Sequence, residues 1–283
     1  MGFSTDTQPP PTPTYLLSYP AEHVLLITIN RPKQMNSLPF SSHWEADALL
    51  SWFDSEPQLR VAVVTGGGDR AFCAGQDLIE QDQIAKEFRK GTPRPAQMTR
   101  HPPGGFMAIS RRQGKKPVIA AVNGWAMGGG FEIVLGCDMV VAAPKAVFAL
   151  PEASRGLYAA AGGLSRLVRV VGKMVASEIA MAGRKLSAEE AVRYHVANKV
   201  SKTNESVVPE AIELAKSIAG LSPDAIIVTR QGLLDSWEVG SVERATQLTE
   251  ERYGPQLRRS QNLSIGLAAF AAKKAPQWVP SKL

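Results

Sequence analysis

Short, continuous apolar runs rich in β-branched residues recur along the first part of the chain and end at turn signals. Each has the length of a buried strand; they lie within residues 22–32, 61–68 and 118–122. Residues 40–53 instead carry large apolar side chains at helical spacing, and Ser41 or Ser42 is placed to cap that helix.

Later segments continue the alternation and then become helical. Residues 139–154 read as two short strands separated by a proline-containing turn, and Ser187 with Glu190 forms the capping box of a short helix. From Val207 onward the apolar spacing is helical. We therefore predict an α/β core over residues 14–205 and a helical C-terminal region over residues 206–280.

Two segments depart from this pattern. Residues 1–13 are rich in Pro, Thr and Gln, a composition that predicts a disordered tail. Residues 80–116 are polar and charged, with one helical piece and a Pro/Gly-rich part. Long segments of this kind are often lids or ligand-binding loops.

The composition adds a positive charge to this picture. The chain has 283 residues, 44% of them hydrophobic and 20% charged, with a formal net charge of +6. That balance is typical of a globular protein that buries a sizeable core. The charge suits a phosphate-bearing ligand, a nucleic acid or an anionic membrane, although scattered surface Lys and Arg give the same count.

The cysteine and histidine residues indicate neither a disulfide scaffold nor a metal site. Cys73 and Cys137 form no CxxC pair, and their apolar surroundings predict reduced, buried thiols in an intracellular protein. The four histidines have no metal-ligand spacing, so we expect no metal site.

The ends of the chain bear on localisation. The first residues lack a basic segment followed by an apolar one, so no secretory signal is expected. Asn123 and Glu132 inside the apolar stretch 118–143 argue against a membrane span. The last three residues, Ser281-Lys282-Leu283, match the tripeptide that the peroxisomal import receptor reads. We expect an exposed targeting tripeptide and a peroxisomal protein.

The stretch 117–138 holds the most specific pattern, an apolar run followed by Gly128-Gly129-Gly130 and Glu132. Three glycines in a row are costly to order, so the backbone there must approach something closely or adopt positive φ. A helix that starts at this point aims unpaired N–H groups at a ligand. A similar strand–glycine–helix pattern occurs around residues 61–78, and we expect the two glycine sites to face one pocket.

Three familiar motifs fail. The Gly66-x-Gly68 pattern is interrupted where a dinucleotide-binding helix has to continue, and Gly172-Lys173 lacks the Ser or Thr of a P-loop. No Gly-x-Ser-x-Gly elbow is present, which disfavours a serine hydrolase.

The remaining motifs resemble the enoyl-CoA hydratase/isomerase (crotonase) superfamily, in family order and over about residues 15–270. The matching stretches are Asn30-Arg31-Pro32, Asn36-Ser37-Leu38, Ala71-Phe72-Cys73-Ala74-Gly75-Gln76-Asp77-Leu78, Ala121-Val122-Asn123-Gly124, Gly128-Gly129-Gly130-Phe131-Glu132, Phe148-Ala149-Leu150-Pro151-Glu152 and Gly162-Gly163-Leu164-Ser165-Arg166-Leu167. The GGGFE and FALPEA stretches look closest to the branch that contains carnitinyl-CoA dehydratases. The resemblance implies a spiral of ββα units, a C-terminal helical region for trimerisation, and a homotrimer or dimer of trimers.

The resemblance also implies an oxyanion hole. The backbone N–H groups of Gln76 and Gly129 would hold the thioester oxygen, on which negative charge develops when water adds to an enoyl thioester or its α-proton is removed. Each such donor typically contributes about 3–4 kcal/mol to lowering the barrier.

By the same resemblance, Glu132 and Glu152 would hold one water molecule between them. Two carboxyl groups with separated pKa values can supply both a base and an acid. We assign water activation to Glu132 and proton donation to Glu152.

The acyl-CoA thioester is expected as substrate, with no further cofactor and no metal. Lys33 is expected to meet the CoA phosphates, and the other expected CoA or substrate contacts are Ala74, Gln76, Asp77, Leu78, Ile79 and Gly129. Departures from the family at Ala159-Ala160, where Pro-Gly is usual, and at His195, where Gly is usual, leave the choice of substrate open.

These residues predict hydration of a 2-trans-enoyl-CoA to a 3-hydroxyacyl-CoA, or the reverse dehydration, in β-oxidation or secondary-metabolite acyl processing. One alternative within the fold is a Δ3-Δ2-enoyl-CoA isomerase, which typically needs only one carboxylate. A remote alternative is RNA binding, with Arg111-Arg112 and Lys115-Lys116 as phosphate contacts. The leading prediction assigns no nucleic acid partner.

Overall fold

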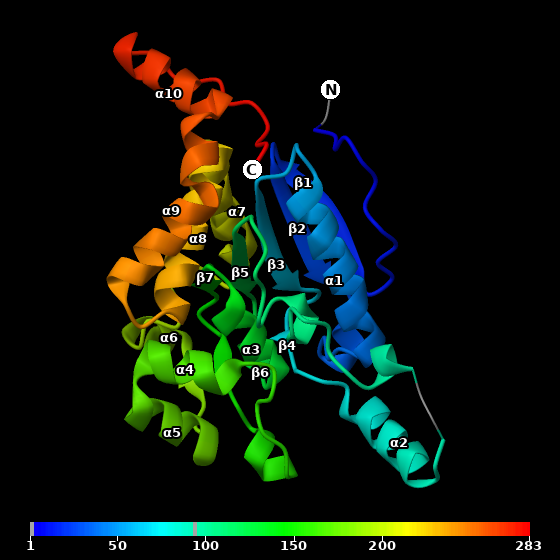
Figure 1. Ribbon diagram of the computed structural model, residues 1–283. Helices are drawn as coiled ribbons and strands as arrows, with labels where there is room; N and C mark the ends of the chain where they lie inside the picture. Colours follow the sequence, from blue (N-terminus) through cyan, green and yellow to red (C-terminus); the bar gives the residue numbers. More distant parts are fainter. Residues whose placement is uncertain (1–2, 93–94) are drawn as a thin grey trace.

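The computed structural model describes residues 3–92 and 95–283, and a six-stranded sheet forms its centre (Figure 1). Only the first pair of strands is antiparallel, and every later neighbour in the sheet is parallel. In spatial order the strands are β1 (Tyr15–Ala21), β2 (Val24–Ile29), β3 (Val61–Gly66), β5 (Val118–Val122), β7 (Met139–Ala142) and β10 (Lys199–Val200).

A smaller, four-stranded sheet lies beside it. Its strands are β4 (Ala71–Cys73), β6 (Trp125–Met127), β8 (Val147–Ala149) and β9 (Leu186–Ser187). Strands β3 and β4, β5 and β6, and β7 and β8 follow each other in pairs, each pair contributing one strand to each sheet. Successive units of the chain therefore form a spiral, as the resemblance to the crotonase superfamily implied.

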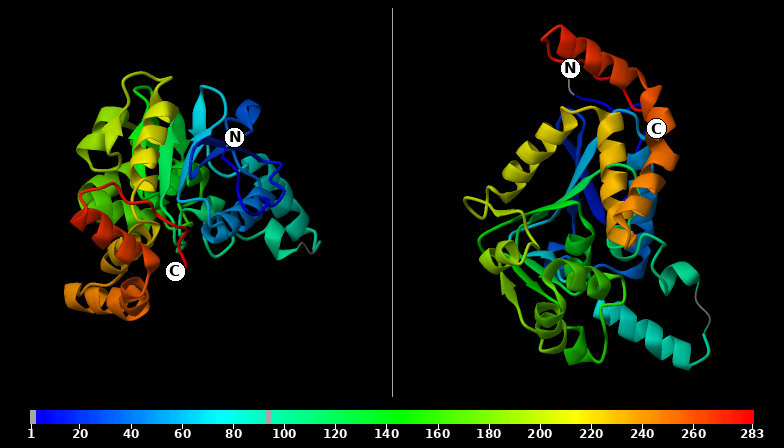
Figure 2. Two further views of the ribbon diagram at one scale, coloured as in Figure 1. Left: turned by 90° about the horizontal axis from the view of Figure 1, so that it is seen from above. Right: turned by 60° about the vertical axis from the view of Figure 1, so that its left-hand side comes forward.

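Helices surround both sheets. They are α1 (Phe40–Ser55), α2 (Leu78–Arg89), α3 (Gly129–Gly136), α4 (Gly163–Val171), α5 (Lys173–Met181), α6 (Ala188–Arg193), α7 (Val207–Ala219), α8 (Pro223–Glu238), α9 (Val242–Arg258) and α10 (Gln261–Ala271). Four short 3-10 turns are η1 (Pro32–Gln34), η2 (Ala96–Met98), η3 (Phe106–Ala108) and η4 (Glu152–Arg155). Helix α2 projects from one end of the molecule, and α10 and both termini lie at the other (Figures 1 and 2).

The parallel strands are apolar on both faces because each face is covered. Val61 and Val63 pack with α7, whose Ala211 and Ala215 are fully buried, in one cluster. The alternate residues, such as Val64, belong to the larger cluster that includes α1. This double coverage explains the continuous apolar runs, because alternating side chains of a strand enter opposite cores.

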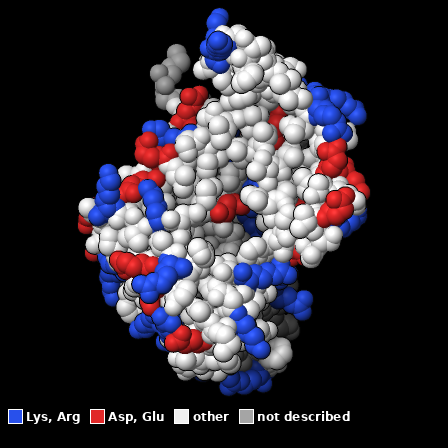
Figure 3. Space-filling model, turned by 90° about the vertical axis from the view of Figure 1, so that its left-hand side faces the viewer, with Lys and Arg blue, Asp and Glu red and all other residues white. Residues whose placement is uncertain are grey.

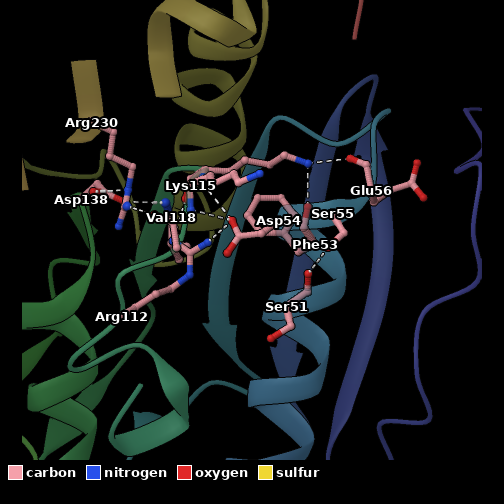
Figure 4. Close-up of polar contacts among 12 residues, drawn as sticks. Ser51, Phe53, Asp54, Ser55, Glu56, Arg112, Lys115, Val118, Asp138 and Arg230 are labelled. Atoms are coloured by element: carbon pink, nitrogen blue, oxygen red, sulfur yellow. Dashed lines mark hydrogen bonds and ion pairs between the residues drawn. The ribbon is translucent and has the colours of Figure 1, made fainter. Parts of the chain in front are cut away.

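A buried polar network joins the end of α1 to the segment before β5 (Figure 4). The carboxylate of Asp54 accepts hydrogen bonds from Arg112 at 2.5 Å and from the backbone N–H groups of Lys115 and Lys116, each at 3.0 Å. The ammonium of Lys116 donates to the carbonyls of Phe53 and Glu56, which α1 leaves unpaired at its C-terminus. Burial lowers the pKa of Lys116 to about 8.

A second ion pair ties the C-terminal region to this network. Arg230 of α8 lies 2.9 Å from Asp138 and also donates to the carbonyl of Gly114, while Asp138 accepts from the N–H of Val118 (Figure 4). Arg112 and Arg230 are both buried. The two Arg–Asp pairs therefore hold α1, β5 and α8 together.

Most elements agree with the sequence predictions, including the strands around residues 24–29, 61–66 and 118–122 and the capping box of Ser187 and Glu190. The predicted cap of α1 is wrong. Pro39 is the N-cap residue and no side chain caps this helix, because Ser42 instead donates to the carbonyl of Pro39.

The N-terminal segment also differs from the expected disordered tail. The carboxylate of Glu56 accepts hydrogen bonds from the backbone N–H groups of Asp6 and Thr7, and Trp52 donates to the Thr7 hydroxyl at 2.8 Å. Phe3 packs against Tyr19 with ring centroids 5.7 Å apart. Composition alone does not reveal Glu56 and Trp52 as partners, because they lie 45 to 50 residues away in the chain.

The C-terminal tripeptide is not the free tail that was expected. Ser281 and Leu283 are half-buried and line a cavity of about 90 Å³ with Asp54 and Lys116. The carbonyl of Leu283 accepts a hydrogen bond from Lys115 at 2.8 Å. No helix within the described residues is long and apolar enough to cross a bilayer.

Candidate active site

Two backbone N–H groups, those of Gln76 and Gly129, meet where the two glycine-rich segments touch. Gly129 is the first residue of α3, so its N–H has no partner in the helix. Within residues 3–92 and 95–283, neither N–H has a hydrogen-bond acceptor. A Cβ atom on Gly75 would lie 3.2 Å from the nitrogen of Gly129. Two adjacent unpaired donors are what an oxyanion hole requires.

The three consecutive glycines are explained by close approach. A Cβ atom at Gly128, where φ is +56°, would lie 3.1 Å from Oε1 of Glu152. At Gly129 it would lie 2.5 Å from the ring of Phe106, and at Gly130 it would lie 2.0 Å from the carbonyl oxygen of Cys73. The expected need for glycine is therefore confirmed. Gly75 of the first glycine-bearing unit also lies against Gly128 and Gly129 of the second, and that both units face one pocket stays a prediction.

Glu132 is buried in the first turn of α3, with 3% of its surface exposed. Its Oε1 accepts hydrogen bonds from the backbone N–H groups of Ala161 at 2.9 Å and Gly163 at 2.8 Å. Burial raises the pKa of Glu132, and the nearby charge of Glu152 adds to the rise. The two N–H groups oppose it, and the resulting pKa is about 7. This carboxyl group is therefore ready to exchange a proton near neutral pH.

Glu152 begins η4 and is half-buried beside Gly128. Its Oε2 is shielded from solvent and has no hydrogen-bond partner among the described residues. Burial raises the pKa of Glu152 as well. A buried carboxylate oxygen without a partner is unusual, and a polar group of a ligand or a water molecule would satisfy it.

The arrangement brings together four of the residues singled out from sequence: Gln76, Gly129, Glu132 and Glu152. Two free N–H donors can stabilise a developing oxyanion, and two carboxyl groups with raised pKa values can exchange protons. Nothing in this set calls for a metal. Within residues 3–92 and 95–283, no group of three His, Cys, Asp or Glu side chains is arranged to hold one.

The expected CoA contacts lie along the N-terminus of α2. Asp77 is the N-cap residue of this helix and accepts from the N–H groups of Ile79 and Glu80, and its carboxylate also lies 3.1 Å from Arg31. The Arg31–Asp77 pair holds η1, which carries exposed Lys33, against the start of α2. Ala74 is half-buried, and Leu78 and Ile79 are exposed, at 40% and 75%.

Sequence reasoning missed several residues next to the site. His43 of α1 and His101 both contact the side chain of Gln76, and the ring of Phe106 covers Gly129. Ser110 donates to the carbonyl of Ala161, which fixes the loop whose N–H groups hold Glu132. Sequence periodicity did not single out His43, because its partners come from other parts of the chain.

The residues proposed for RNA contact lie elsewhere and are partly buried. Arg112 is 5% exposed and Lys116 is 7% exposed, and both are committed to the Asp54 network. On the face shown in Figure 3, positive and negative side chains are interspersed. Arg112 and Lys116 are therefore not available as phosphate contacts.

Comparison with known proteins places this site in a family. Residues 20–280 match the sequence profile of the enoyl-CoA hydratase/isomerase family, and the chain belongs to this family. The positive φ of His195, 61°, agrees with the glycine that the family usually has there.

Among its relatives, the mevalonyl-coenzyme A hydratase of Beauveria bassiana is 45% identical and is matched over 98% of both chains. The carnitinyl-CoA dehydratase of Proteus mirabilis is 36% identical, over 90% of this chain and 94% of the relative. The crystal structure of the enoyl-CoA hydratase of Mycobacterium tuberculosis H37Rv superposes with a TM-score of 0.81 at 32% identity, covering 95% of this chain and all of that one. The resemblance to the crotonase superfamily and its fold is confirmed.

Proposed function

We propose that this chain is a lyase that adds water to, or removes water from, the acyl group of a CoA thioester, and that mevalonyl-CoA is a substrate. The single observation that carries the reaction type is the pair of carboxyl groups, buried Glu132 and half-buried Glu152, near two unpaired backbone N–H donors. The choice of thioester is supported by the 45% identity to a mevalonyl-coenzyme A hydratase.

In the dehydration direction, Glu152 as carboxylate removes the α-proton of the 3-hydroxyacyl thioester. The electron pair moves onto the thioester oxygen, which the N–H groups of Gln76 and Gly129 hold. Protonated Glu132 then gives its proton to the departing hydroxyl, and water leaves as the double bond forms. Hydration runs through the same steps in reverse, with Glu132 activating the water and Glu152 supplying the proton at the α-carbon.

The raised pKa of Glu132, about 7, supports this division of roles. Near neutral pH the group is present in both protonation states, so it can act as the acid in one direction and as the base in the other. The backbone donors to its Oε1 keep the carboxyl plane fixed, which leaves the other oxygen to meet the reacting water.

The isomerase alternative needs only one proton-exchanging carboxyl group. Retention of a second one with an unpartnered oxygen, Oε2 of Glu152, favours the hydratase. Incubation with a 3-enoyl-CoA distinguishes them: conjugation of the double bond without any 3-hydroxy product would overturn the proposed reaction type.

The test of the proposed function is a panel of enoyl-CoA thioesters followed by loss of the conjugated-thioester absorbance, with mevalonyl-CoA assayed in the dehydration direction. Wild-type protein is compared with Glu132→Gln and Glu152→Gln, each expected to lose at least about 100-fold in rate. Rates equal to wild type in both variants would refute the mechanism.

Two further expectations are proposals of the same kind. We propose that α8–α10 form the interface of a homotrimer. Six copies in light scattering would indicate a dimer of trimers. Support comes from exposed apolar side chains on these helices, such as Val242 at 84% and Phe270 at 85%. A monomer at micromolar concentration in light scattering would contradict it.

We also propose that Ser281-Lys282-Leu283 directs the protein to peroxisomes. Receptor binding requires the tripeptide to separate from its neighbours, which breaks the hydrogen bond from Lys115 to Leu283. A fluorescent protein fused at the N-terminus is expected in peroxisomes, and diffuse fluorescence that is unchanged by deletion of Leu283 would contradict the proposal.

A further inference from the structure

The side chain of Gln76 has an amide nitrogen with nothing to donate to. Its Nε2 is shielded from solvent and has no partner among the described residues. Its Oε1, by contrast, lies 3.0 Å from Nε2 of His43 and 3.4 Å from Nε2 of His101. A buried donor left unpaired costs about 1–3 kcal/mol, so it calls for an explanation.

The orientation of this amide follows from the hydrogen bonds of His43. The N–H of Met107 donates to Nδ1 of His43 at 3.1 Å, so Nδ1 carries no proton. His43 is fully buried, and burial lowers its pKa to about 3, so the neutral ring carries its proton on Nε2. That N–H donates to Gln76, which must therefore present its oxygen to the histidine. The NH₂ group is the part left free.

The residue that carries the free NH₂ group is also part of the proposed active site. The backbone N–H of the same residue is one of the two oxyanion donors. The ring of Phe106 lies between the histidines and the other donor: its centroid is 4.3 Å from that of His43, and it covers Gly129. The Gln76 side chain thus borders the space that an acyl group enters when its carbonyl occupies the oxyanion hole.

The backbone that holds His43 in place is strained. Met107 and Ala108 have φ values of 52° and 49°, a left-handed conformation that costs residues other than glycine about 1–3 kcal/mol each. The hydrogen bonds that hold this segment include those from Met107 to His43 and from Phe106 to the hydroxyl of Ser110 at 2.8 Å. Strain of this kind persists where the surroundings over-determine it, and here it keeps the Gln76 amide in one orientation.

We propose that the amide NH₂ of Gln76, oriented by His43 and His101, donates a hydrogen bond to an oxygen atom of the acyl group beyond its β-carbon. The proposed substrate has such an atom, because mevalonyl-CoA carries a terminal hydroxyl. The inference rests on the proposed function and names the residue that selects hydroxylated acyl groups. A purely apolar acyl chain leaves the buried donor unpaired, and a site of this kind discriminates against such a chain.

The experiment compares mevalonyl-CoA with its deoxy analogue, in which hydrogen replaces the terminal hydroxyl. Wild-type protein is expected to favour mevalonyl-CoA in kcat/KM by at least about 5-fold, from the 1–3 kcal/mol of an unpaired donor. In Gln76→Met, which keeps the length of the side chain without its amide, the ratio is expected to fall to near one. Because the backbone of residue 76 is part of the oxyanion hole, the readout is the ratio and not either rate.

Gln83→Met serves as the matched control, since Gln83 is an exposed glutamine of α2 and the chemical change is identical. It is expected to keep the wild-type ratio. His101→Phe keeps an aromatic ring beside Phe40, 5.6 Å away, but removes one donor to Gln76, and the ratio is expected to fall part of the way.

The outcomes separate the two proposals. A wild-type ratio within about threefold of one, or a ratio that Gln76→Met leaves unchanged, overturns this inference while the lyase function stands. The wild-type comparison requires no variant to fold. If the wild-type protein converts neither thioester, the choice of mevalonyl-CoA as substrate is overturned, and this inference is overturned with it.

Discussion

Replacing Glu132 by Gln is expected to make the protein inactive and, above neutral pH, more stable. The substitution keeps the shape of the side chain, and the amide oxygen can still accept from Ala161 and Gly163. It removes only the ability to exchange a proton and to carry a buried charge. Activity and stability are therefore expected to change in opposite directions.

The magnitude follows from the raised pKa. Glu132 has a pKa of about 7 in the folded chain against the ordinary value of 4.5. Below the ordinary value both folded and unfolded chains carry the proton, so the group has no effect on stability. As the pH rises the unfolded chain ionises first, so the folded wild-type protein loses stability until Glu132 also ionises. Above pH 7 the full penalty is about 3 kcal/mol, and at about pH 5 less than about 1 kcal/mol remains.

The assay is urea unfolding of wild type and Glu132→Gln at about pH 5 and about pH 9, with hydration rates measured on the same preparations. The variant is expected to gain about 3 kcal/mol in free energy of unfolding at the higher pH and little at the lower. Its hydration rate is expected to fall at least about 100-fold. A gain in stability that is the same at both pH values, or absent at both, would refute the reasoning that the buried carboxyl group has a raised pKa.

The other predictions concern residues around the site and in the buried network. Gly129→Ala places a Cβ atom 2.5 Å from the ring of Phe106, so the oxyanion N–H is displaced and kcat is expected to fall about 10²–10³-fold. Gly240→Ala, which meets nothing within 4 Å, is the control, and an equal loss in both would contradict the argument. Glu152→Gln is expected to abolish exchange of the α-proton with solvent deuterium, as followed by mass spectrometry of bound product; undiminished exchange would assign that proton to another group. Asp54→Ala leaves buried Arg112 unpaired and is expected to cost about 3–5 kcal/mol in denaturant unfolding, and a loss below about 1 kcal/mol would show that the pair contributes little.

Local patterns in the sequence were sufficient for the elements that frame the site. The apolar runs of β3 and β5 end at turns, and the glycines at 128–130 mark the start of a helix. A strand, a tight turn and a helix start can therefore be predicted without any knowledge of distant residues. A close approach of other atoms to the backbone at these glycines was also predictable, because three consecutive glycines lose much conformational entropy on folding.

What the resemblance to a family supplied was the pairing of Glu132 with Glu152. Each glutamate taken alone is consistent with a helix-terminal or surface role. Their spacing in the chain says nothing of the Coulombic interaction between them, which depends on η4 lying beside the start of α3.

Tertiary structure alone decided the remaining features. The raised pKa of Glu132 comes from burial against loops that follow it in the chain, and the order of the N-terminal segment comes from the distant carboxylate of Glu56. The neutral state of His43 comes from its burial. Its tautomer, and with it the free amide of Gln76, depends on a hydrogen bond from Met107, which is 64 residues away from His43. Sequence patterns report local backbone preference and periodicity, whereas desolvation and hydrogen-bond partners are set by residues that only folding brings together. The sequence by itself thus determined where the site lies, and the packing of distant segments determined the charge and hydrogen-bonding capacity of the groups within it.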